Sequence, residues 1–472
     1  MTGIRFGTSG WRGILAEDFT FPNARLVTQA IADYLHGEGS AGQGVVIGYD
    51  TRFLSEAFAR TAAEVMAGNG IRSFMAQRDT PTPVVSHSIR VGRRAGGINI
   101  TASHNPPPYN GLKFSPSTGG PAPTDVTDAI ESRINSLDPG SIRSISLAEA
   151  RQRGLVVDFD PSHDYLLHLK GLIHEEALRR ASLKVVVDVL WGTGRGYLDA
   201  LLREFGVEAE VLHASRDPYF GGHRPEPSGE FLDELSERVR ASRAHLGLAM
   251  DADADRFGVV NEEGRYHQAN EILPLLLDYL IRSRGWPGGV ARSVATTHLI
   301  DRVARHHGRP VYETKVGFKY LGEYIQKDSV VMVGEESEGF SMKGHLPEKD
   351  GILACLLVTE MVACTGKGIQ ELLEGLFSRV GPLRTMRLNL SLEPAVKARL
   401  IERLKCPPRV FAGQAVVDHV TLDGHKYILA DGSWVCFRPS GTEPVVRFYM
   451  ESPTEEGLAR LRAAGETLLR EV

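Results

Sequence analysis

The sequence predicts an α/β fold with three related α/β units and a smaller α+β domain at the C-terminus. Three segments share one order: an apolar run rich in Val and Ile, a loop, an amphipathic stretch of helical period, a Gly, and a second apolar run that ends in polar residues. The short apolar runs do not alternate strictly, which is typical of strands buried on both faces. Each segment is therefore predicted to be a β-α-β unit with parallel strands.

The three repeated units can be followed element by element. The first contains the predicted strand 45–50, the helical stretch FARTAAEVMAGNG and the strand GGINI. The second contains strand 184–189, GYLDALLREFG and LGLAM, and the third contains strand 291–297, HLIDRVARHHG and VVMVG. Their last strands lead into the polar loops TASHN, DADADR and GEESEG. Ligands of open α/β sheets bind beyond the carboxyl ends of strands, so we expect these loops to meet at one site.

The pattern changes after Pro382, which predicts an α+β domain rather than a fourth repeat. Residues 386–392 are predicted to form a strand and residues 393–404 a helix; a hairpin around Asp423-Gly424, a strand VVRFYME and a final helix follow. We place the domains at residues 1–152, 153–258, 259–375 and 376–472.

Composition and charge favour a globular protein of the cytoplasm. The 472 residues are 42% hydrophobic and 24% charged, and the net charge of -5 comes without any block of like charges. This gives no argument for nucleic acid or a membrane surface as partner. The chain start lacks a signal-peptide pattern, and the longest mostly apolar run, 352–364, falls short of a span of ~18 residues. Four cysteines without CxxC spacing are expected to be free, buried thiols: Cys355, Cys364, Cys406 and Cys436.

The loop DADADR carries acids at every second position, Asp251, Asp253 and Asp255. On an extended backbone these side chains share one side, and a slight curl brings their oxygens onto one hard cation. A solvated acidic turn is the simpler alternative. An EF-hand calcium loop is a second alternative, but Arg256 stands where that loop needs Gly and the flanks are predicted strands.

The loop TASHN places Ser103 beside His104, ahead of three prolines that exclude a helix. An acyl-transfer triad is disfavoured because the chain has no GxSxG motif and adjacent side chains on an extended backbone point to opposite faces. A serine in a stiff loop opposite metal-binding acids can instead carry a phosphoryl group. A capped polar turn remains the alternative.

Two further loops carry groups suited to a phosphosugar. In RPSGTEP, backbone amides and hydroxyls of a Ser-Gly-Thr turn, with the guanidinium groups of Arg438 and Arg447, suit a phosphate, although a polar turn with surface arginines fits as well. In GEESEG, Glu335 and Ser337 can bind sugar hydroxyls, although charged residues after a strand usually face water.

These loops, in this order, resemble the α-D-phosphohexomutase family, which includes phosphoglucomutases, phosphomannomutases and phosphoglucosamine mutases. The likeness runs over essentially the whole chain, from FGTSGWRG and GYDTR through TASHNP, NGLKF, DADADR and GEES to RPSGTEP. It implies a heart-shaped chain of four domains, with three related α/β domains of mixed, mainly parallel sheets and a smaller, mobile C-terminal domain.

The resemblance also implies roles for individual residues. Ser103 is the expected phosphoserine and Mg²⁺ the expected metal, held by Ser103, Asp251, Asp253 and Asp255. Arg12, His104 and Lys113 match basic positions near the transferring phosphate, and Lys113 or Arg12 is expected to handle the proton. A surface cation is the alternative for Lys113. The expected substrate-binding residues are Arg256, Gly317, Glu335, Ser337, Lys349, Arg438, Ser440, Gly441, Thr442 and Arg447.

Departures from the family pattern bear on the substrate. Ala252 and Ala254 stand where the metal loop usually has Gly, at a cost of ~1 kcal/mol each if those sites need a positive φ. The segment TKVGFKYLG, with Phe318 where bifunctional enzymes carry His, resembles glucose-specific phosphoglucomutases, as do GEESEGF and EKDG. Glu336 argues against an amino sugar, because phosphoglucosamine mutases usually have GEQS.

The predicted function is the interconversion of α-D-glucose 1-phosphate and glucose 6-phosphate, through a phosphoserine and glucose 1,6-bisphosphate as intermediate and activator. Mannose phosphates are the alternative substrates, alone or beside glucose phosphates. A non-catalytic phosphosugar-binding protein is the alternative from another class. The expected partner is a small phosphosugar, with no nucleic acid or membrane, and the chain is expected to be a monomer or homodimer.

Overall fold

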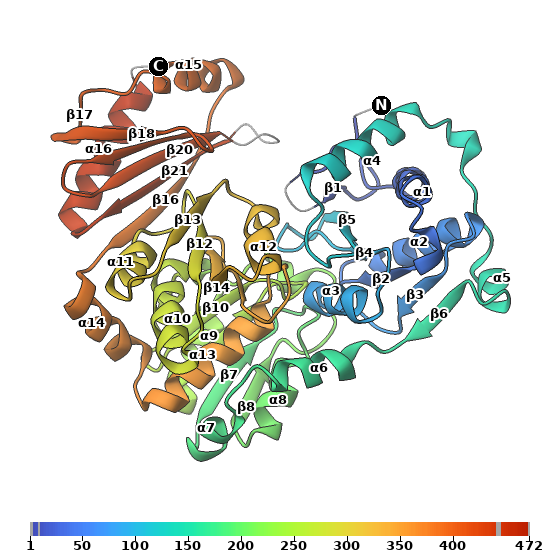
Figure 1. The fold of residues 1–472 in the computed structure, drawn as a ribbon, viewed down its shortest axis with the longest axis horizontal. Helices are drawn as coiled ribbons and strands as arrows, with labels where there is room; N and C mark the ends of the chain where they lie inside the picture. Colours follow the sequence, from blue (N-terminus) through green and yellow to red (C-terminus); the bar gives the residue numbers. More distant parts are fainter. Residues whose placement is uncertain (1–2, 8–9, 440–444, 471–472) are drawn as a thin grey trace.

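The computed structural model describes residues 3–7, 10–439 and 445–470 and contains four successive sheets, each with its own helices (Figure 1). The first three sheets contain parallel strand pairs, and in the described residues the strands of the fourth pair antiparallel. The predicted fold class is therefore confirmed. In Figure 1 the first unit and the C-terminal unit stand on opposite sides, joined by the second and third units.

The first unit is a six-stranded sheet covered on both faces. Its strands, in spatial order, are β1 (Trp11–Ile14), β5 (Tyr109–Pro116), β4 (Gly96–Ile100), β2 (Val45–Tyr49), β3 (Ser73–Ala76) and β6 (Val156–Phe159). Its helices are α1 (Phe21–Gly37), α2 (Ser55–Gly68), α3 (Thr82–Val91), α4 (Thr124–Ser136) and α5 (Leu147–Gln152). Apolar residues of α1, α2 and α4 share one core, whereas α3 packs with Val46 of β2 in a separate cluster. Because β6 pairs with β3, this sheet extends beyond the boundary predicted near residue 152.

The second unit is a five-stranded sheet that ends in the acidic loop. Its strands, in spatial order, are β11 (Tyr266–His267), β10 (Phe257–Asn261), β9 (Leu246–Met250), β7 (Lys184–Asp188) and β8 (Glu208–Leu212). Its helices are α6 (Ser162–Lys170), α7 (Glu175–Arg180), α8 (Leu198–Glu204) and α9 (Asp233–Ser242). Strand β10 turns back antiparallel to β9, so this sheet also runs past the boundary predicted near residue 258.

The third unit shares its hydrophobic core with the second. Its strands are β13 (Val311–Thr314), β12 (Gly289–Ser293), β14 (Val330–Glu335) and β15 (Gly339–Met342), and its helices are α10 (Ala269–Arg284), α11 (Leu299–His306), α12 (Phe318–Gln326), α13 (Gly351–Thr365) and α14 (Ile369–Val380). Helix α13 is apolar nearly all round and joins one core with strands of both units. It starts where the Asp350 carboxylate accepts the Leu353 amide and ends at Gly366 with φ 66°.

The C-terminal unit is an antiparallel sheet with its own core. Its strands, in spatial order, are β16 (Arg384–Ser391), β21 (Val445–Ser452), β20 (Trp434–Pro439), β19 (His425–Leu429), β18 (Gln414–Val420) and β17 (Val410–Phe411). Helices α15 (Pro394–Leu404) and α16 (Glu455–Arg470) contribute Leu400 and Leu461 to that core. The predicted hairpin is present, because β18 and β19 pair around the Asp423-Gly424 turn.

The predicted burial of the four thiols is wrong for two of them. All four cysteines are free, but only Cys355 and Cys436 are buried, whereas Cys364 and Cys406 are exposed near the C-terminal ends of α13 and α15. In the described part of the chain, no single helix is long and apolar enough to cross a membrane. The consecutive helices α13 and α14 meet the length and composition test together but are bent by 78°.

Candidate active site

The Ser103 loop follows β4 and has a strained backbone at the serine itself. Ser103 is buried with φ 51°, a left-handed conformation that is uncommon for a residue with a side chain. The Thr101 hydroxyl accepts the Ser103 amide at 2.9 Å, and the Ala102 carbonyl accepts the Asn105 amide at 3.1 Å. These bonds close a tight turn ahead of the three prolines.

The guanidinium group of Arg52 binds the backbone of this loop. Arg52 is fully buried on the segment after β2 and pairs with Asp50 at 3.2 Å. Its two terminal nitrogens donate to four carbonyl oxygens, which come from Ser103 (2.5 Å), Asn105 (2.5 Å), Pro106 (2.9 Å) and Tyr109 (3.0 Å). One fixed cation thus holds the backbone from Ser103 to Tyr109.

The acidic loop after β9 brings three buried carboxylates together. The oxygens of Asp251, Asp253 and Asp255 lie within 4.8 Å of one another. The loop is a turn rather than an extended strand, because the Asp251 carboxylate accepts the amides of Asp255 (3.0 Å) and Arg256 (3.1 Å). Ala254 has φ 54°, so one of the two Ala positions carries the predicted backbone strain.

The serine lies directly on this cluster. The Ser103 hydroxyl donates to Asp251 Oδ2 at 2.6 Å, although 148 residues separate the two in sequence. Burial, followed by the charges of Asp253 and Asp255, raises the pKa of Asp251 well above its usual range. The expected convergence of the serine and the three acids is therefore present.

The residues of this cluster fit a hard divalent cation. Asp253 Oδ1 and Asp255 Oδ1 are buried and have no hydrogen-bond partner among the described residues. Buried carboxylate oxygens without partners are costly unless a cation or water satisfies them. Oxygen donors at this spacing are the ligands that Mg²⁺ prefers.

Two lysines contact the outer side of the acidic cluster. Lys113 Nζ lies 2.6 Å from Asp253 and 3.0 Å from Asp255, and Lys349 Nζ lies 3.0 Å from Asp255. Burial lowers the pKa of Lys113, but the two carboxylates outweigh this effect and raise it; the pKa of Lys349 is raised in the same way by Asp255 and Glu348. Both lysines are buried, so neither is a surface cation.

The prediction that Ser103 and His104 point to opposite faces is wrong. His104 Nδ1 lies 3.4 Å from Ser103 Oγ, because the left-handed backbone at Ser103 turns both side chains to the same side. Burial, with the positive charges of Arg256 and Arg12, lowers the pKa of His104 well below its usual range, so the imidazole is neutral. Arg12 donates to the Asn105 side chain at 2.5 Å, and burial with nearby Arg256 lowers the pKa of Arg12 to about 10.

The loop between β14 and β15 places carboxylates beside the acidic turn. The Gly317 amide donates to Glu335 Oε1 at 2.6 Å, and burial, with the neighbouring Glu336, raises the pKa of Glu335 to about 7. Arg256 pairs with Glu338 at 3.5 Å, and its own backbone bridges to Gly339. Ser337 lies half-buried in the same loop.

The C-terminal unit supplies two arginines on neighbouring strands. Arg438 on β20 is directly opposite Arg447 on β21, and Arg438 Nε donates to Asp423 Oδ2 at 2.8 Å. Ser440, Gly441 and Thr442 lie outside the described residues, so their part in a phosphate site stays a prediction.

Comparison with known proteins agrees with this geometry over the whole chain. Four models of phosphoglucomutase/phosphomannomutase domains match: the alpha/beta/alpha domains I, II and III at residues 3–140, 163–264 and 268–380, and the C-terminal domain at 396–466. The chain belongs to the phosphoglucomutase/phosphomannomutase family. The resemblance stated from the sequence motifs is thereby confirmed.

Relatives in this family carry different substrate names. A phosphoglucomutase from Komagataeibacter xylinus is 31% identical over 95% of this chain and 87% of its own length. A phosphoglucomutase/phosphomannomutase from Thermococcus kodakarensis is 30% identical over 99% of both chains. A Thermus thermophilus protein provisionally assigned as a phosphomannomutase has a crystal structure with a TM-score of 0.87, at 32% identity over 99% of both chains. These names support a phosphohexomutase and leave the choice of sugar open.

Sequence reasoning missed a threonine that ties the first unit to the acidic turn of this phosphohexomutase. The Thr82 hydroxyl donates to Asp253 Oδ2 at 2.5 Å, its amide donates to the Asp253 carbonyl at 2.9 Å, and Asn99 donates to the hydroxyl at 2.7 Å. Thr82 lies within the segment TPTP and opens α3, and nothing in its local pattern indicates a partner 171 residues away.

A chain of hydrogen bonds joins the second and third units near the same site, and a ring contact adds the first unit. His168 Nε2 lies 2.9 Å from His345 Nδ1, and His345 Nε2 lies 2.7 Å from the Asp350 carboxylate, which also accepts the Tyr165 hydroxyl at 2.6 Å. His87 of α3 packs its ring against His168, with centroids 4.9 Å apart. Burial, followed by the charge of His345, lowers the pKa of both His87 and His168 to about 4, so these rings pack as neutral groups.

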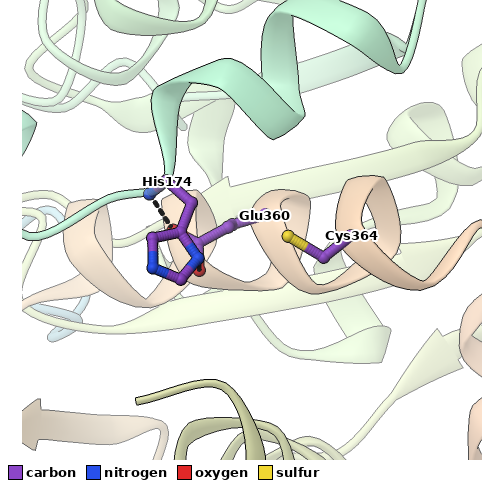
Figure 2. Close-up of side chains that lie close together, drawn as sticks. All are labelled: His174, Glu360 and Cys364. Atoms are coloured by element: carbon purple, nitrogen blue, oxygen red, sulfur yellow. Dashed lines mark hydrogen bonds and ion pairs between the residues drawn. The ribbon is translucent and has the colours of Figure 1, made fainter.

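A second cluster in the described residues has metal-binding donors but already contains a cation. Glu360 and Cys364 of α13 lie together with His174 of the neighbouring segment (Figure 2). Arg284 donates to Glu360 at 2.7 Å and also lies 2.7 Å from the His174 ring nitrogens, while Tyr279 donates to Glu360 and Cys364. A metal ion at this position would have to displace a buried guanidinium, so we interpret the cluster as a structural link between the second and third units.

Proposed function

We propose that this chain interconverts α-D-glucose 1-phosphate and glucose 6-phosphate, with Ser103 as the residue that carries the phosphoryl group. The observation that carries the proposal is the 2.6 Å contact between Ser103 Oγ and Asp251 inside a buried cluster of three carboxylates. A serine hydroxyl that only closed a turn would not need acidic neighbours. Carboxylates arranged around a hydroxyl suit a group whose own negative charge is offset by a bound cation.

The proposed reaction is two phosphoryl transfers in opposite directions. In the first, the bond between phosphorus and Ser103 Oγ breaks and a bond to the free sugar hydroxyl forms, which gives glucose 1,6-bisphosphate. In the second, the other phosphate of that bisphosphate returns to Ser103 Oγ. The sugar hydroxyl loses a proton in the first transfer, and the newly freed hydroxyl gains one in the second, so protons balance over the cycle.

The surrounding cations divide into two kinds. Lys113 is held charged by two carboxylates and is suited to stabilise negative charge rather than to exchange a proton. The neutral His104, 3.4 Å from Ser103 Oγ, and Arg12, whose pKa is lowered to about 10, are the groups able to exchange one near Ser103. Of the two residues expected to handle the proton, Lys113 and Arg12, we therefore favour Arg12, and we add His104.

Asp251, Asp253 and Asp255 would hold Mg²⁺ together with an oxygen of the phosphorylated Ser103. When bound, the ion offsets the charge of the phosphoryl group. The two carboxylate oxygens without partners, on Asp253 and Asp255, support this assignment.

Substrate binding is assigned to two groups of residues on different units. Glu335, Ser337 and Gly317 would meet the sugar hydroxyls, and Arg256 and Lys349 the phosphate nearer Ser103. Arg438 and Arg447, with Ser440, Gly441 and Thr442, would hold the phosphate that is not being transferred.

The glucose preference rests on the residues around Lys349. Phe318 stands where a hydrogen-bonding His occurs in bifunctional relatives, and Lys349 Nζ lies 5.5 Å from the centre of the Phe318 ring. The buried Phe318 ring is a cation–π partner of Lys349 and offers no hydrogen bond to a sugar hydroxyl. We therefore place glucose phosphates ahead of mannose phosphates.

A comparison of both sugars tests this choice. With Mg²⁺ and a catalytic amount of the matching 1,6-bisphosphate, kcat/KM is expected to be higher for glucose 1-phosphate than for mannose 1-phosphate. The reverse order would make the protein a phosphomannomutase. Ser103→Ala is expected to lose turnover with both sugars while its unfolding curve stays cooperative; turnover equal to the parent would refute the role of Ser103. A parent protein that binds both sugar phosphates without turnover would be a non-catalytic binding protein.

A further inference from the structure

The C-terminal unit contacts the third unit through an apolar patch and through polar contacts that include those of Glu451, Lys426 and Asp423. The patch joins Ala295 and Val316 with Trp434, Cys436 and Tyr449. Two polar contacts are buried and lie away from the proposed substrate residues. Glu451 accepts from Thr297 and Trp434, and Lys426 donates to the Val294 carbonyl at 2.8 Å and to Glu313 at 3.0 Å.

The third polar contact is made by Asp423 and involves a proposed substrate residue. Asp423 Oδ2 accepts from Arg438 Nε at 2.8 Å and from the Val316 amide at 3.0 Å. The carboxylate is three-quarters buried, with 23% of the side chain exposed. Gly424, with φ 92°, follows it in a turn so tight that a Cβ would lie 2.5 Å from the Phe437 carbonyl, so the position of Asp423 is fixed.

The next amide along the chain binds a second carboxylate. Gly317 has φ 130° and donates to Glu335 Oε1 at 2.6 Å. Two successive backbone amides, of Val316 and Gly317, therefore connect Asp423 of the C-terminal unit with Glu335 of the third unit. Arg438 and Glu335 are thus linked by hydrogen bonds to Asp423 and Gly317 and by the covalent backbone between Val316 and Gly317.

We propose that Asp423 is a positioning residue that sets the phosphate-binding arginine and the sugar-binding loop relative to one another. The inference rests on the proposed function, in which Arg438 holds the distal phosphate and Glu335 holds the sugar. One oxygen of the Asp423 carboxylate accepts hydrogen bonds from both Arg438 and the Val316 amide, so a displacement of Asp423 would shift both partners. Docking of the C-terminal unit on the third unit would therefore set the position of Arg438 relative to Glu335, and Asp423 would contribute to binding without touching the substrate.

Binding of sugar phosphates in the Ser103→Ala background tests this role without turnover. Titration calorimetry with glucose 1-phosphate and with mannose 1-phosphate should show that Asp423→Ala weakens binding of the preferred sugar about tenfold. The matched control is Asp431→Ala, since Asp431 lies in the next hairpin turn of the same sheet and accepts the Ser433 amide within that hairpin. The control should bind as the parent does.

A second pair of variants separates the two hydrogen bonds of Asp423. With Arg438→Met already present, Asp423→Ala should still weaken binding about threefold, because the Val316 amide loses its acceptor. Asp423→Asn in the same background should change little, because the Asn oxygen can still accept that amide. Thermal unfolding of each variant confirms that the C-terminal unit remains folded.

The outcomes distinguish this inference from the function on which it rests. If Asp423→Ala binds as tightly as the control, or adds nothing to Arg438→Met, the positioning role is refuted while the phosphohexomutase proposal stands. If the Ser103→Ala parent binds neither sugar phosphate, the proposed function fails and this inference fails with it. An additional loss with Asp423→Ala and none with Asp423→Asn supports the inference.

Discussion

Replacement of Arg52 by lysine tests how the fold holds the proposed phosphoserine. The guanidinium donates to four backbone carbonyls of the Ser103 loop and pairs with Asp50. An ammonium group has three donors at a single atom, so Lys cannot reach carbonyls that Arg spans with a planar fork. Two of the four carbonyls would then remain buried without a donor.

The expected magnitude follows from these lost bonds. A hydrogen bond to a charged group contributes about 1.5 kcal/mol or more, so two lost bonds lower the free energy of unfolding by about 3 kcal/mol. Ser103 adopts a left-handed backbone that the surroundings must hold in place, and a displacement of ~1 Å at a reacting group costs about 100-fold in rate. Arg52→Lys is therefore expected to lower kcat about 100-fold and to leave KM nearly unchanged.

Urea unfolding and steady-state kinetics measure the two effects separately. Arg284→Lys is the matched control, because Arg284 is also a buried arginine but its partners are His174, Glu360 and the Leu172 carbonyl. The control should lose stability and keep kcat. A folded Arg52→Lys protein with the kcat of the parent would refute the argument that this guanidinium positions Ser103.

Three further predictions concern charge. Lys113→Met removes a buried cation between Asp253 and Asp255 and should lower the free energy of unfolding by about 3 kcal/mol. Mg²⁺ should then raise the Tm of the variant more than that of the parent, and equal Tm shifts would contradict this. Burial raises the pKa of Glu335 to about 7, so its contribution to stability is present below the ordinary pKa and lost as pH rises through 7. Glu335→Gln should therefore gain up to about 3 kcal/mol over the parent between pH 5 and pH 8 in urea unfolding, and a constant difference would contradict this. The pKa of His87 is lowered to about 4, so the parent should lose stability as pH falls from about 6.5 to 4. His87→Gln should lose about 2 kcal/mol less over this range, and parallel plots of unfolding free energy against pH would contradict this.

Much of the fold follows from patterns that the sequence displays locally. Each repeated unit has the predicted central strands and intervening helix, because buried parallel strands need continuous apolar runs and the helices need one apolar face. The boundaries were less predictable. Strand β6 follows α5 in the chain and pairs with β3 of the first sheet. Its sequence pattern does not indicate which sheet it extends.

Some of the site residues could likewise be predicted from local sequence, whereas others could not. Ser103 and the three aspartates were predictable because each stands in a distinctive loop after an apolar strand. The contact between Ser103 and His104 was not, since a left-handed backbone at a serine is set by tertiary contacts such as the Arg52 bonds. The roles of Thr82 and Asp423 likewise depend on partners 171 and 107 residues away, and no local pattern encodes such pairings.

Intact-mass spectrometry after incubation with glucose 1,6-bisphosphate and Mg²⁺ tests the phosphoserine most directly. The account predicts a gain of about 80 Da, the mass of one phosphoryl group, that maps to Ser103, disappears after addition of excess glucose 1-phosphate, and is absent from Ser103→Ala. A protein that turns over glucose phosphates without this gain, or that carries it on another residue, would contradict the proposed role of Ser103.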